Sequence, residues 1–241
     1  MTILGKILLG PILLFQGKRV RRTALRLPEA AGLRMGVEGA NFDGLALRLL
    51  VVGDSSAAGV GVERQEQALA QPLAQELAKR LARPVAWQLI AKSGIDTTET
   101  MGLLEAEAPQ PADVLVTALG VNDVTGQRSG EHFVGDYGRM LDTVRKRAGI
   151  SLFVANGLPP MHLLPALPQP LRWYLGQYAF RLDHALQRWI AGMPDARYLS
   201  LHWGEGGDVA RDGFHPGPLQ YRRWAKKLAA TIAEALPGYP S

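Results

Sequence analysis

From residue 46 onward, short apolar runs alternate with longer segments that have the apolar spacing of helices. The runs have the length of buried strands, and several are followed directly by glycine. The expected strands are 46–52, 85–90, 113–119, 151–155 and 197–201, and the expected helices are 66–82, 130–148, 171–191 and 218–236. Parallel strands need helical crossovers, so this alternation predicts an α/β protein, a three-layer α/β/α arrangement around a parallel, flavodoxin-like five-stranded sheet.

Composition agrees with one folded domain of ordinary size. Of the 241 residues, 47% are hydrophobic and 20% are charged, which excludes wholesale disorder. The chain has no cysteine, so disulfides, thiolate nucleophiles, zinc–thiolate sites and iron–sulfur clusters are excluded. We therefore divide the chain into an N-terminal arm, 1–30, and a body, 31–241.

The arm carries the entire net charge of the chain. It contains six of the 27 basic residues and one of the 22 acidic residues, so the net charge of +5 resides there and the body is neutral. A body without basic excess does not support nucleic-acid binding. The apolar stretch 7–15 precedes the cationic cluster 18–22, whereas a secretory signal has the reverse order. This favours a cytoplasmic location, peripheral on the inner face of an anionic membrane, over export. A helix packed on the body and a disordered tail remain the alternatives.

Polar residues follow the expected strands, at the edge of a parallel sheet where ligands bind. Ser55 follows the first strand and Gly53, and its hydroxyl can project into the crevice. The competing interpretation is a helix N-cap. His215 has Asp212 three residues before it, so one turn can bring a base and its orienting carboxylate together. An ordinary capping turn would use the same aspartate.

Two further strand ends offer hydrogen-bond donors for an oxyanion. Gly94 follows the second strand and has no side chain to block its N–H. Asn122 follows the third strand and supplies a side-chain amide, and Asp123 beside it can brace the loop. Taken singly, a turn glycine and an Asx-turn explain these residues as well.

Together these blocks resemble the SGNH/GDSL hydrolase superfamily over residues 46–235. The blocks are Gly53-Asp54-Ser55, Gly94, Gly120-Val121-Asn122-Asp123 and Asp212-Gly213-Phe214-His215-Pro216. The resemblance implies a serine esterase or lipase-like enzyme with Ser55 as nucleophile, His215 as base and Asp212 as the third triad member. It also implies an oxyanion hole formed by the N–H groups of Ser55 and Gly94 and the amide of Asn122. No metal or cofactor is required by this chemistry. Ser56 departs from the family motif, which often has leucine there.

The substrate is the least determined feature of the sequence. An esterase, a lipase, a lysophospholipase and an O-deacylase all fit, and the acyl length and alcohol remain open. The apolar segment 161–178 lies on the crevice side, and we expect Leu163, Leu164 and Trp173 to contact substrate. Packing of a long loop on the body is the alternative. A non-catalytic flavodoxin-like ligand-binding protein and a membrane-associated adaptor are the competing functions, and the oligomeric state is open.

Overall fold

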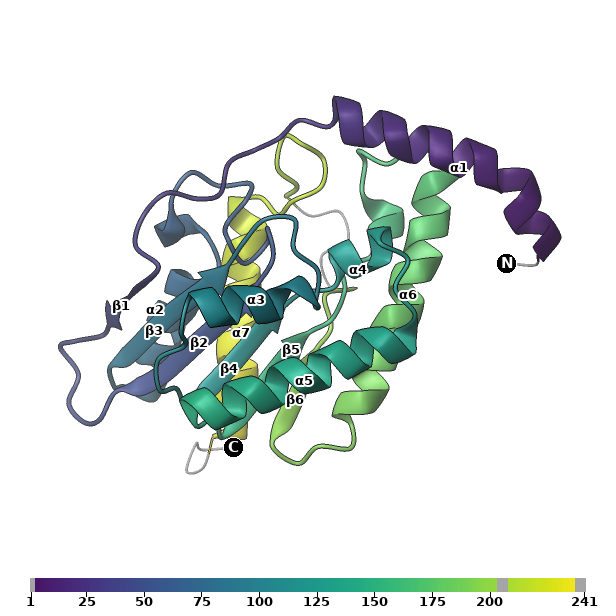
Figure 1. The fold of residues 1–241 in the computed structure, drawn as a ribbon. Helices are drawn as coiled ribbons and strands as arrows, with labels where there is room; N and C mark the ends of the chain where they lie inside the picture. Colours follow the sequence, from purple (N-terminus) through teal and green to yellow (C-terminus); the bar gives the residue numbers. More distant parts are fainter. Residues whose placement is uncertain (1–2, 203–207, 237–241) are drawn as a thin grey trace.

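The computed structural model describes residues 3–202 and 208–236 (Figure 1). The strands are β1 (Met35–Glu38), β2 (Leu47–Gly53), β3 (Val85–Ala91), β4 (Val114–Ala118), β5 (Leu152–Asn156) and β6 (Ala196–Leu199). The helices are α1 (Ile3–Thr23), α2 (Ala70–Leu81), α3 (Glu99–Ala106), α4 (Val121–Thr125), α5 (Gly130–Ala148), α6 (Leu171–Ile190) and α7 (Pro218–Ala235), with short 3-10 turns at Gln65–Gln67 and Met161–Leu163. Each of the nine elements expected from the sequence is present within a few residues of its predicted bounds.

The sheet has six strands in the order β1-β3-β2-β4-β5-β6. The five predicted strands are all parallel and have the predicted flavodoxin-like order, because the chain moves outward from β2 first to β3 and then to β4. The predicted strand count of five was wrong: β1 adds to β3 as an antiparallel edge strand. β1 has only four residues and is half exposed, so it lacks the apolar run that marks the others.

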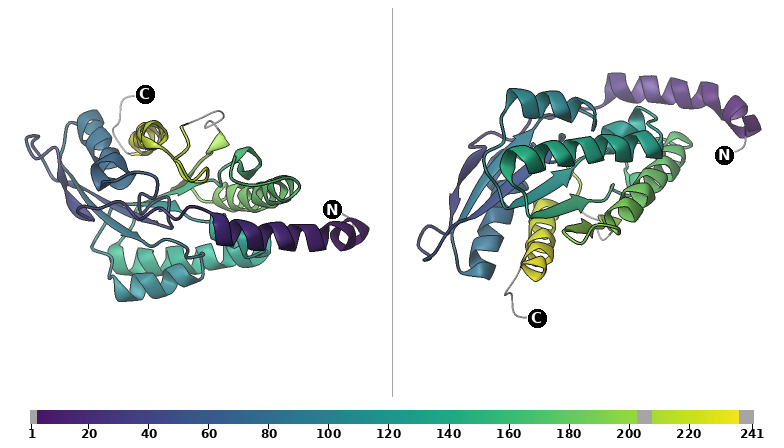
Figure 2. Two further views of the ribbon diagram at one scale, coloured as in Figure 1. Left: turned by 90° about the horizontal axis from the view of Figure 1, so that it is seen from above. Right: turned by 60° about the horizontal axis from the view of Figure 1, so that its bottom comes forward.

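Two apolar clusters cover the two faces of the sheet. Because successive strand residues point to opposite faces, Leu49 and Val51 pack with α2 and α7, whereas Leu50 and Val52 pack with α5 and α6. The left view of Figure 2 shows these helices on opposite sides of the sheet. The predicted three-layer α/β/α arrangement is therefore confirmed.

Local signals in the sequence set the ends of several helices. In α5, the Ser129 hydroxyl accepts a hydrogen bond from the His132 N–H, and Gly149 ends the helix in the left-handed conformation. In α2, Pro72 lies in the first turn, where its missing N–H costs no helical hydrogen bond. Such caps explain why the predicted helix bounds are close to the observed ones.

The N-terminal arm is mostly one helix, α1, which extends beyond the edge of the body (Figures 1 and 2). Leu13 and Val20 pack against the apolar cluster that includes α6. The Gln16 side chain donates to the Gln169 carbonyl at 2.7 Å and accepts from the Leu171 N–H at 3.0 Å. No helix within 3–202 or 208–236 is both long and apolar enough to cross a membrane. The disordered-tail interpretation of the arm therefore gives way to a helix that touches the body.

Candidate active site

The site lies where β2, β3 and β4 end side by side. Gly53 is the last residue of β2, and a Cβ atom there would come within 2.5 Å of both the Ala118 carbonyl oxygen and the Ala57 side chain. The absence of a side chain at Gly53 thus lets the chain after β2 turn tightly against β4. Ser55 follows immediately and lines the cavity at this edge.

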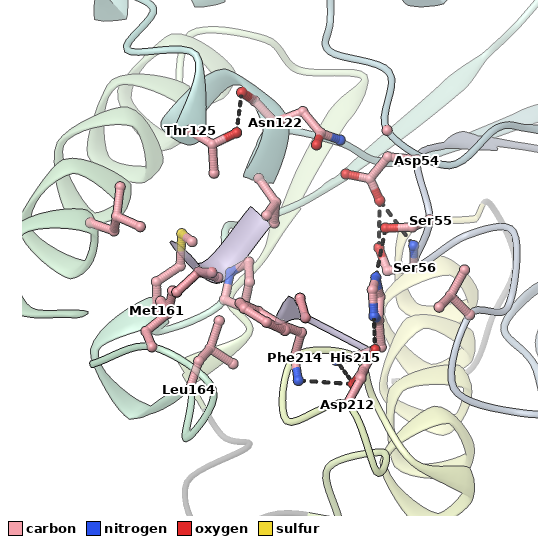
Figure 3. Close-up of a pocket in the computed structure, with 18 of the residues that line it drawn as sticks. Asp54, Ser55, Ser56, Asn122, Thr125, Met161, Leu164, Asp212, Phe214 and His215 are labelled. Atoms are coloured by element: carbon pink, nitrogen blue, oxygen red, sulfur yellow. Dashed lines mark hydrogen bonds and ion pairs between the residues drawn. The ribbon is translucent and has the colours of Figure 1, made fainter. Parts of the chain in front are cut away.

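The structure brings Ser55, His215 and Asp212 into one hydrogen-bonded series (Figure 3). Ser55 Oγ lies 2.9 Å from His215 Nε2, and His215 Nδ1 lies 2.6 Å from Asp212 Oδ2. An ionised carboxylate only accepts, so Nδ1 carries the proton toward Asp212 and Nε2 is left to accept from Ser55. Residues that are 160 positions apart in the sequence are therefore in position for proton transfer.

Asp212 is held ionised by its neighbours. Its side chain is only 1% exposed. Burial raises the pKa of this carboxyl, but hydrogen bonds from the His215 ring and from the Phe214 and His215 N–H groups outweigh it and leave the pKa below its usual range. An ionised Asp212 accepts the hydrogen on His215 Nδ1 and so holds the ring with Nε2 toward Ser55.

Ser56, the neighbour of Ser55, is engaged elsewhere. Its hydroxyl and its N–H both donate to Asp54 Oδ1, at 2.8 and 3.0 Å. Burial raises the pKa of Asp54, and these hydrogen bonds and the charge of His215 offset only part of that effect. Ser56 therefore stabilises the turn after β2, while the hydroxyl of Ser55 faces the histidine.

Gly94 and Asn122 line the same cavity as Ser55. Gly94 has φ of +87°, a conformation that favours glycine, in the turn after β3. The Asn122 amide donates one hydrogen to the Ile95 carbonyl at 2.8 Å, which ties α4 to the Gly94 turn. Within 3–202 and 208–236, no residue accepts the second amide hydrogen. Figure 3 shows this side chain reaching from α4 toward the side of the pocket that carries Asp54 and Ser55.

Asp123 braces the same two segments, as the sequence suggested. Its Oδ2 accepts from the N–H and the hydroxyl of Thr97, at 3.1 and 2.9 Å. Burial raises the pKa of Asp123 to about 6 despite these hydrogen bonds. Thr97 was missed by sequence reasoning because no local pattern links it to a residue in another loop.

Glu29 is a second brace that the sequence did not reveal. Glu29 Oε1 accepts from the Ser93 N–H at 2.6 Å, and Oε2 pairs with Arg34 at 2.5 Å. Arg34 in turn donates to the Ala91 carbonyl at 2.6 Å. These contacts hold both ends of the turn that leads to Gly94. The predicted arm, 1–30, therefore contains, one residue before its end, a side chain that supports the site.

The cavity at Ser55 and His215 measures about 1230 Å³ and is mostly apolar. Leu163 and Leu164, which the sequence predicts to contact substrate, line it together with Met161, which lies opposite Ser55 in Figure 3. Trp173 is 43% exposed and lies outside the set of described residues that form the lining. The sequence analysis did not predict that α1 would line this cavity, but several residues of α1 do.

No group of three or more histidine or acidic side chains in 3–202 and 208–236 is placed to hold a metal ion. The donors at the site are a hydroxyl, an imidazole, a carboxylate and amide N–H groups. This set suits acyl transfer at a carbonyl carbon.

A serine, histidine and aspartate at the carboxyl edge of a three-layer α/β fold define a hydrolase class, and comparisons identify its family. Residues 51–223 match the model of the GDSL-like Lipase/Acylhydrolase family, which is well over half of the chain. The chain belongs to this family and is a carboxylic ester hydrolase. No curated protein sequence matches it.

Solved structures share the fold at low sequence identity. The lipase Lip_vut3 from a goat rumen metagenome has 20% identity and a TM-score of 0.64, covering 80% of this chain and 98% of that one. The carbohydrate acetylesterase Est24 from Sinorhizobium meliloti has 16% identity and a TM-score of 0.58, covering 79% and 100%. Phospholipase A1 from Streptomyces albidoflavus NA297 has 16% identity and a TM-score of 0.57, covering 78% and 99%. At these identities the likeness shows the fold and leaves the substrate open.

Proposed function

We propose that this protein hydrolyses carboxylic esters through an acyl-enzyme formed on Ser55. The observation that carries the proposal is the hydrogen-bonded series Asp212–His215–Ser55 at the cavity. His215 Nε2 takes the hydroxyl proton while Ser55 Oγ bonds to the ester carbonyl carbon. The resulting imidazolium is stabilised by Asp212 and gives its proton to the departing alcohol. Water, deprotonated by the same histidine, then releases the acid.

The oxyanion would be held by three donors. They are the N–H groups of Ser55 and Gly94 and the free amide hydrogen of Asn122. Such donors act on charge that develops in the transition state, and each is typically worth about 3–4 kcal/mol of barrier. The hydrogen bonds of Asn122 to Ile95 and of Asp123 to Thr97 support this role because they keep two donors in one arrangement.

The cavity lining favours esters with an apolar acyl group. The contacts expected from the sequence at Leu163 and Leu164 fit this substrate, because both leucines line the cavity beside Ser55. A short acetyl group would leave most of a cavity of about 1230 Å³ unfilled. Lipid esters are therefore the substrate class that we propose.

Covalent labelling of the purified protein with a fluorophosphonate tests the nucleophile. Peptide mapping should place the label on Ser55, and Ser55→Ala should lose the label and roughly 10⁴-fold or more of the turnover. Ser56→Ala is the matched control and should still be labelled. A label on Ser56, or near-normal turnover by Ser55→Ala, would refute the assignment. A protein that neither reacts nor hydrolyses any ester would favour the ligand-binding or adaptor alternatives.

The surface of α1 supports a second proposal, that the protein binds the cytoplasmic face of an anionic membrane. Phe15 and Ile12 are 67% and 46% exposed on this helix and lie outside the lining of the cavity. They lie beside the cationic cluster, whose members Arg19 and Arg22 are also exposed. Exposed apolar side chains beside cations suit insertion into an anionic interface.

Vesicle co-sedimentation measures this binding. Replacing Arg19 and Arg22 by Gln should weaken binding to anionic vesicles roughly thirtyfold, at about 1 kcal/mol per charge. Replacing Arg80 and Arg83 of the body in the same way is the charge-matched control. Equal binding by both double variants would contradict anchoring by α1. A reporter that works only in the periplasm can be fused to the body, and its activity would contradict the cytoplasmic orientation.

A further inference from the structure

The N-terminal arm, which contains α1, is attached to the body at two points. Close to the triad, the Ala30 N–H donates to the Ala58 carbonyl at 3.1 Å, three residues beyond Ser55. Further along the arm, Gln16 makes its two hydrogen bonds to Gln169 and Leu171 at the start of α6. The segment between these points, which includes the C-terminal part of α1, therefore runs from the start of α6 toward the turn after β2, and the C-terminal end of α1 lies nearer to Ser55 than its N-terminal end.

One face of α1 forms a wall of the same cavity that contains Ser55 and His215. Its lining residues recur at helical spacing and are Gly10, Leu13, Leu14, Gly17, Lys18, Val20 and Arg21, with Ala24 directly after the helix. From Gly10 to Ala24 the helix rises about 21 Å, at about 1.5 Å per residue. Met161, Leu164 and Leu167 line the same cavity. Two segments that are far apart in the sequence thus contribute to one mostly apolar space.

Gly17 leaves open space in the middle of this wall. A Cβ atom built at Gly17 would meet no heavy atom within 4 Å, although the residue lines the cavity. Glycine destabilises the helix at this position, because it is about 1 kcal/mol less favourable than alanine in a helix interior. The absence of a side chain at Gly17 therefore enlarges the cavity next to α1.

We propose that α1 is the outer wall of the acyl-chain site and that Gly17 sets how long a chain the site accepts. This inference rests on the proposed function, because it places the acyl chain of the ester along α1, between that helix and the segment around Leu164. The carbonyl end lies at Ser55, and the methyl end of a long chain passes Gly17 and then Leu13. The substrate class is therefore a long-chain ester, and the arm contributes to selectivity as well as to location.

Substitutions at two depths along α1 test this placement in the full-length protein. Gly17→Phe should block the middle of the site, and Leu13→Trp should narrow it about 6 Å further from Ser55. Thr23→Phe adds the same ring at an exposed position of the helix, outside the lining, and is the matched control. The readout is kcat/KM for p-nitrophenyl acetate, butanoate, dodecanoate and hexadecanoate, in detergent-free buffer at concentrations below micelle formation.

We expect Gly17→Phe to lower kcat/KM for dodecanoate and hexadecanoate at least about tenfold relative to butanoate, the equivalent of losing the burial of two methylenes. Leu13→Trp should affect hexadecanoate more than dodecanoate. Acetate and butanoate rates should stay within about twofold in all three variants. The rate at which Ser55 is labelled by a long alkyl fluorophosphonate should fall in Gly17→Phe and Leu13→Trp, whereas the rate with a short one should not. This labelling does not depend on turnover.

Each other outcome overturns a distinct statement. Unchanged chain-length profiles in both Gly17→Phe and Leu13→Trp would place the acyl chain elsewhere while leaving ester hydrolysis intact. Equal changes in Thr23→Phe would show that an added ring anywhere on α1 has this effect, which would contradict a wall at Gly17. A wild-type protein that prefers acetate over all longer esters would also refute the inference. A wild-type protein without Ser55-dependent hydrolysis would refute the proposed function itself.

Discussion

The catalytic edge of the sheet and helix α1 contribute to one cavity but are built in opposite ways. At the edge, the loops that carry Ser55 and Asn122 follow buried parallel strands and are cross-linked by hydrogen bonds. Helix α1 touches the body through Gln16 and through the partly buried Leu13 and Val20. Proton transfer and oxyanion binding need groups held to within a fraction of an ångström. An apolar chain makes non-directional contacts and so tolerates a less rigidly held wall.

This difference predicts where mutations act. Changes at the edge should alter turnover or stability for every ester, because the groups there contact the reacting carbonyl or brace the loops that do. Changes on α1 should alter the ranking of substrates and membrane binding, because few contacts connect it to the rest of the fold. The following predictions sharpen or break this contrast, from the largest effect to the smallest.

Asp212→Asn should lower kcat by about 10⁴-fold for short and long esters alike, because the amide no longer stabilises the imidazolium of His215. Steady-state kinetics with the p-nitrophenyl esters of butanoate and dodecanoate measures kcat for a short and a long substrate. Asp208→Asn, a substitution of the same kind in the same loop, is the control and should keep most activity. A loss confined to long esters would break the contrast between edge and helix.

Asn122→Ala should lower kcat by about a hundredfold or more with little change in KM, since the amide acts on charge that develops in the transition state. Thr125→Ala is the control on the same short helix, where the hydroxyl only donates to the Asn122 carbonyl. Wild-type kcat in a folded Asn122→Ala protein would leave this residue with a purely structural role at the turn.

Asp123→Asn should change how stability depends on pH. The pKa of Asp123 is about 6 in the folded chain, above the usual value of 3.8. The folded state therefore binds more protons than the unfolded state between these values, and stability falls as pH rises through them, by up to about 3 kcal/mol. Urea unfolding of both proteins from about pH 4 to about pH 7 measures this difference. Parallel stability curves would show that Asp123 titrates normally.

Glu29→Gln should have the smallest effect, a decrease of a few-fold in kcat with KM unchanged. The amide oxygen can still accept from Ser93, but the charged pair with Arg34 is lost, and a partly exposed pair is worth about 1 kcal/mol or less. Glu29→Ala should lower kcat further, because the Ser93 N–H loses its acceptor. An increase in KM instead would indicate that Glu29 acts on substrate binding. A protein that lacks residues 1–23 still contains Glu29, whereas one that lacks 1–30 does not. Only the second truncation should therefore lower kcat through the loss of Glu29.

The strands, their order and the residues Ser55, His215, Asp212, Gly94 and Asn122 could be predicted because their signals are local. Apolar periodicity identifies each parallel strand, and a glycine or polar residue identifies its end. A parallel sheet brings such ends to one edge, so Ser55, Gly94 and Asn122 line one cavity, whereas Asp212 and His215 reach it from the loop before α7 and were predicted through the resemblance to a family. The helix caps at Ser129 and Gly149 follow from equally local chemistry.

Other features depended on contacts between distant segments, which no sequence period records. β1 exists because the open edge of β3 offers backbone hydrogen bonds to a segment with weak strand signals of its own. Thr97 and Glu29 became braces only when folding brought them to Asp123 and Ser93. Trp173 has a suitable side chain for the cavity, but its place on α6 leaves it partly exposed outside the lining. The arm has the composition of a membrane-surface segment, and only its docking through Gln16 made it a wall of the cavity. The physical reason is the same in each case: sequence patterns report what one element buries, whereas a site between elements depends on how they pack together.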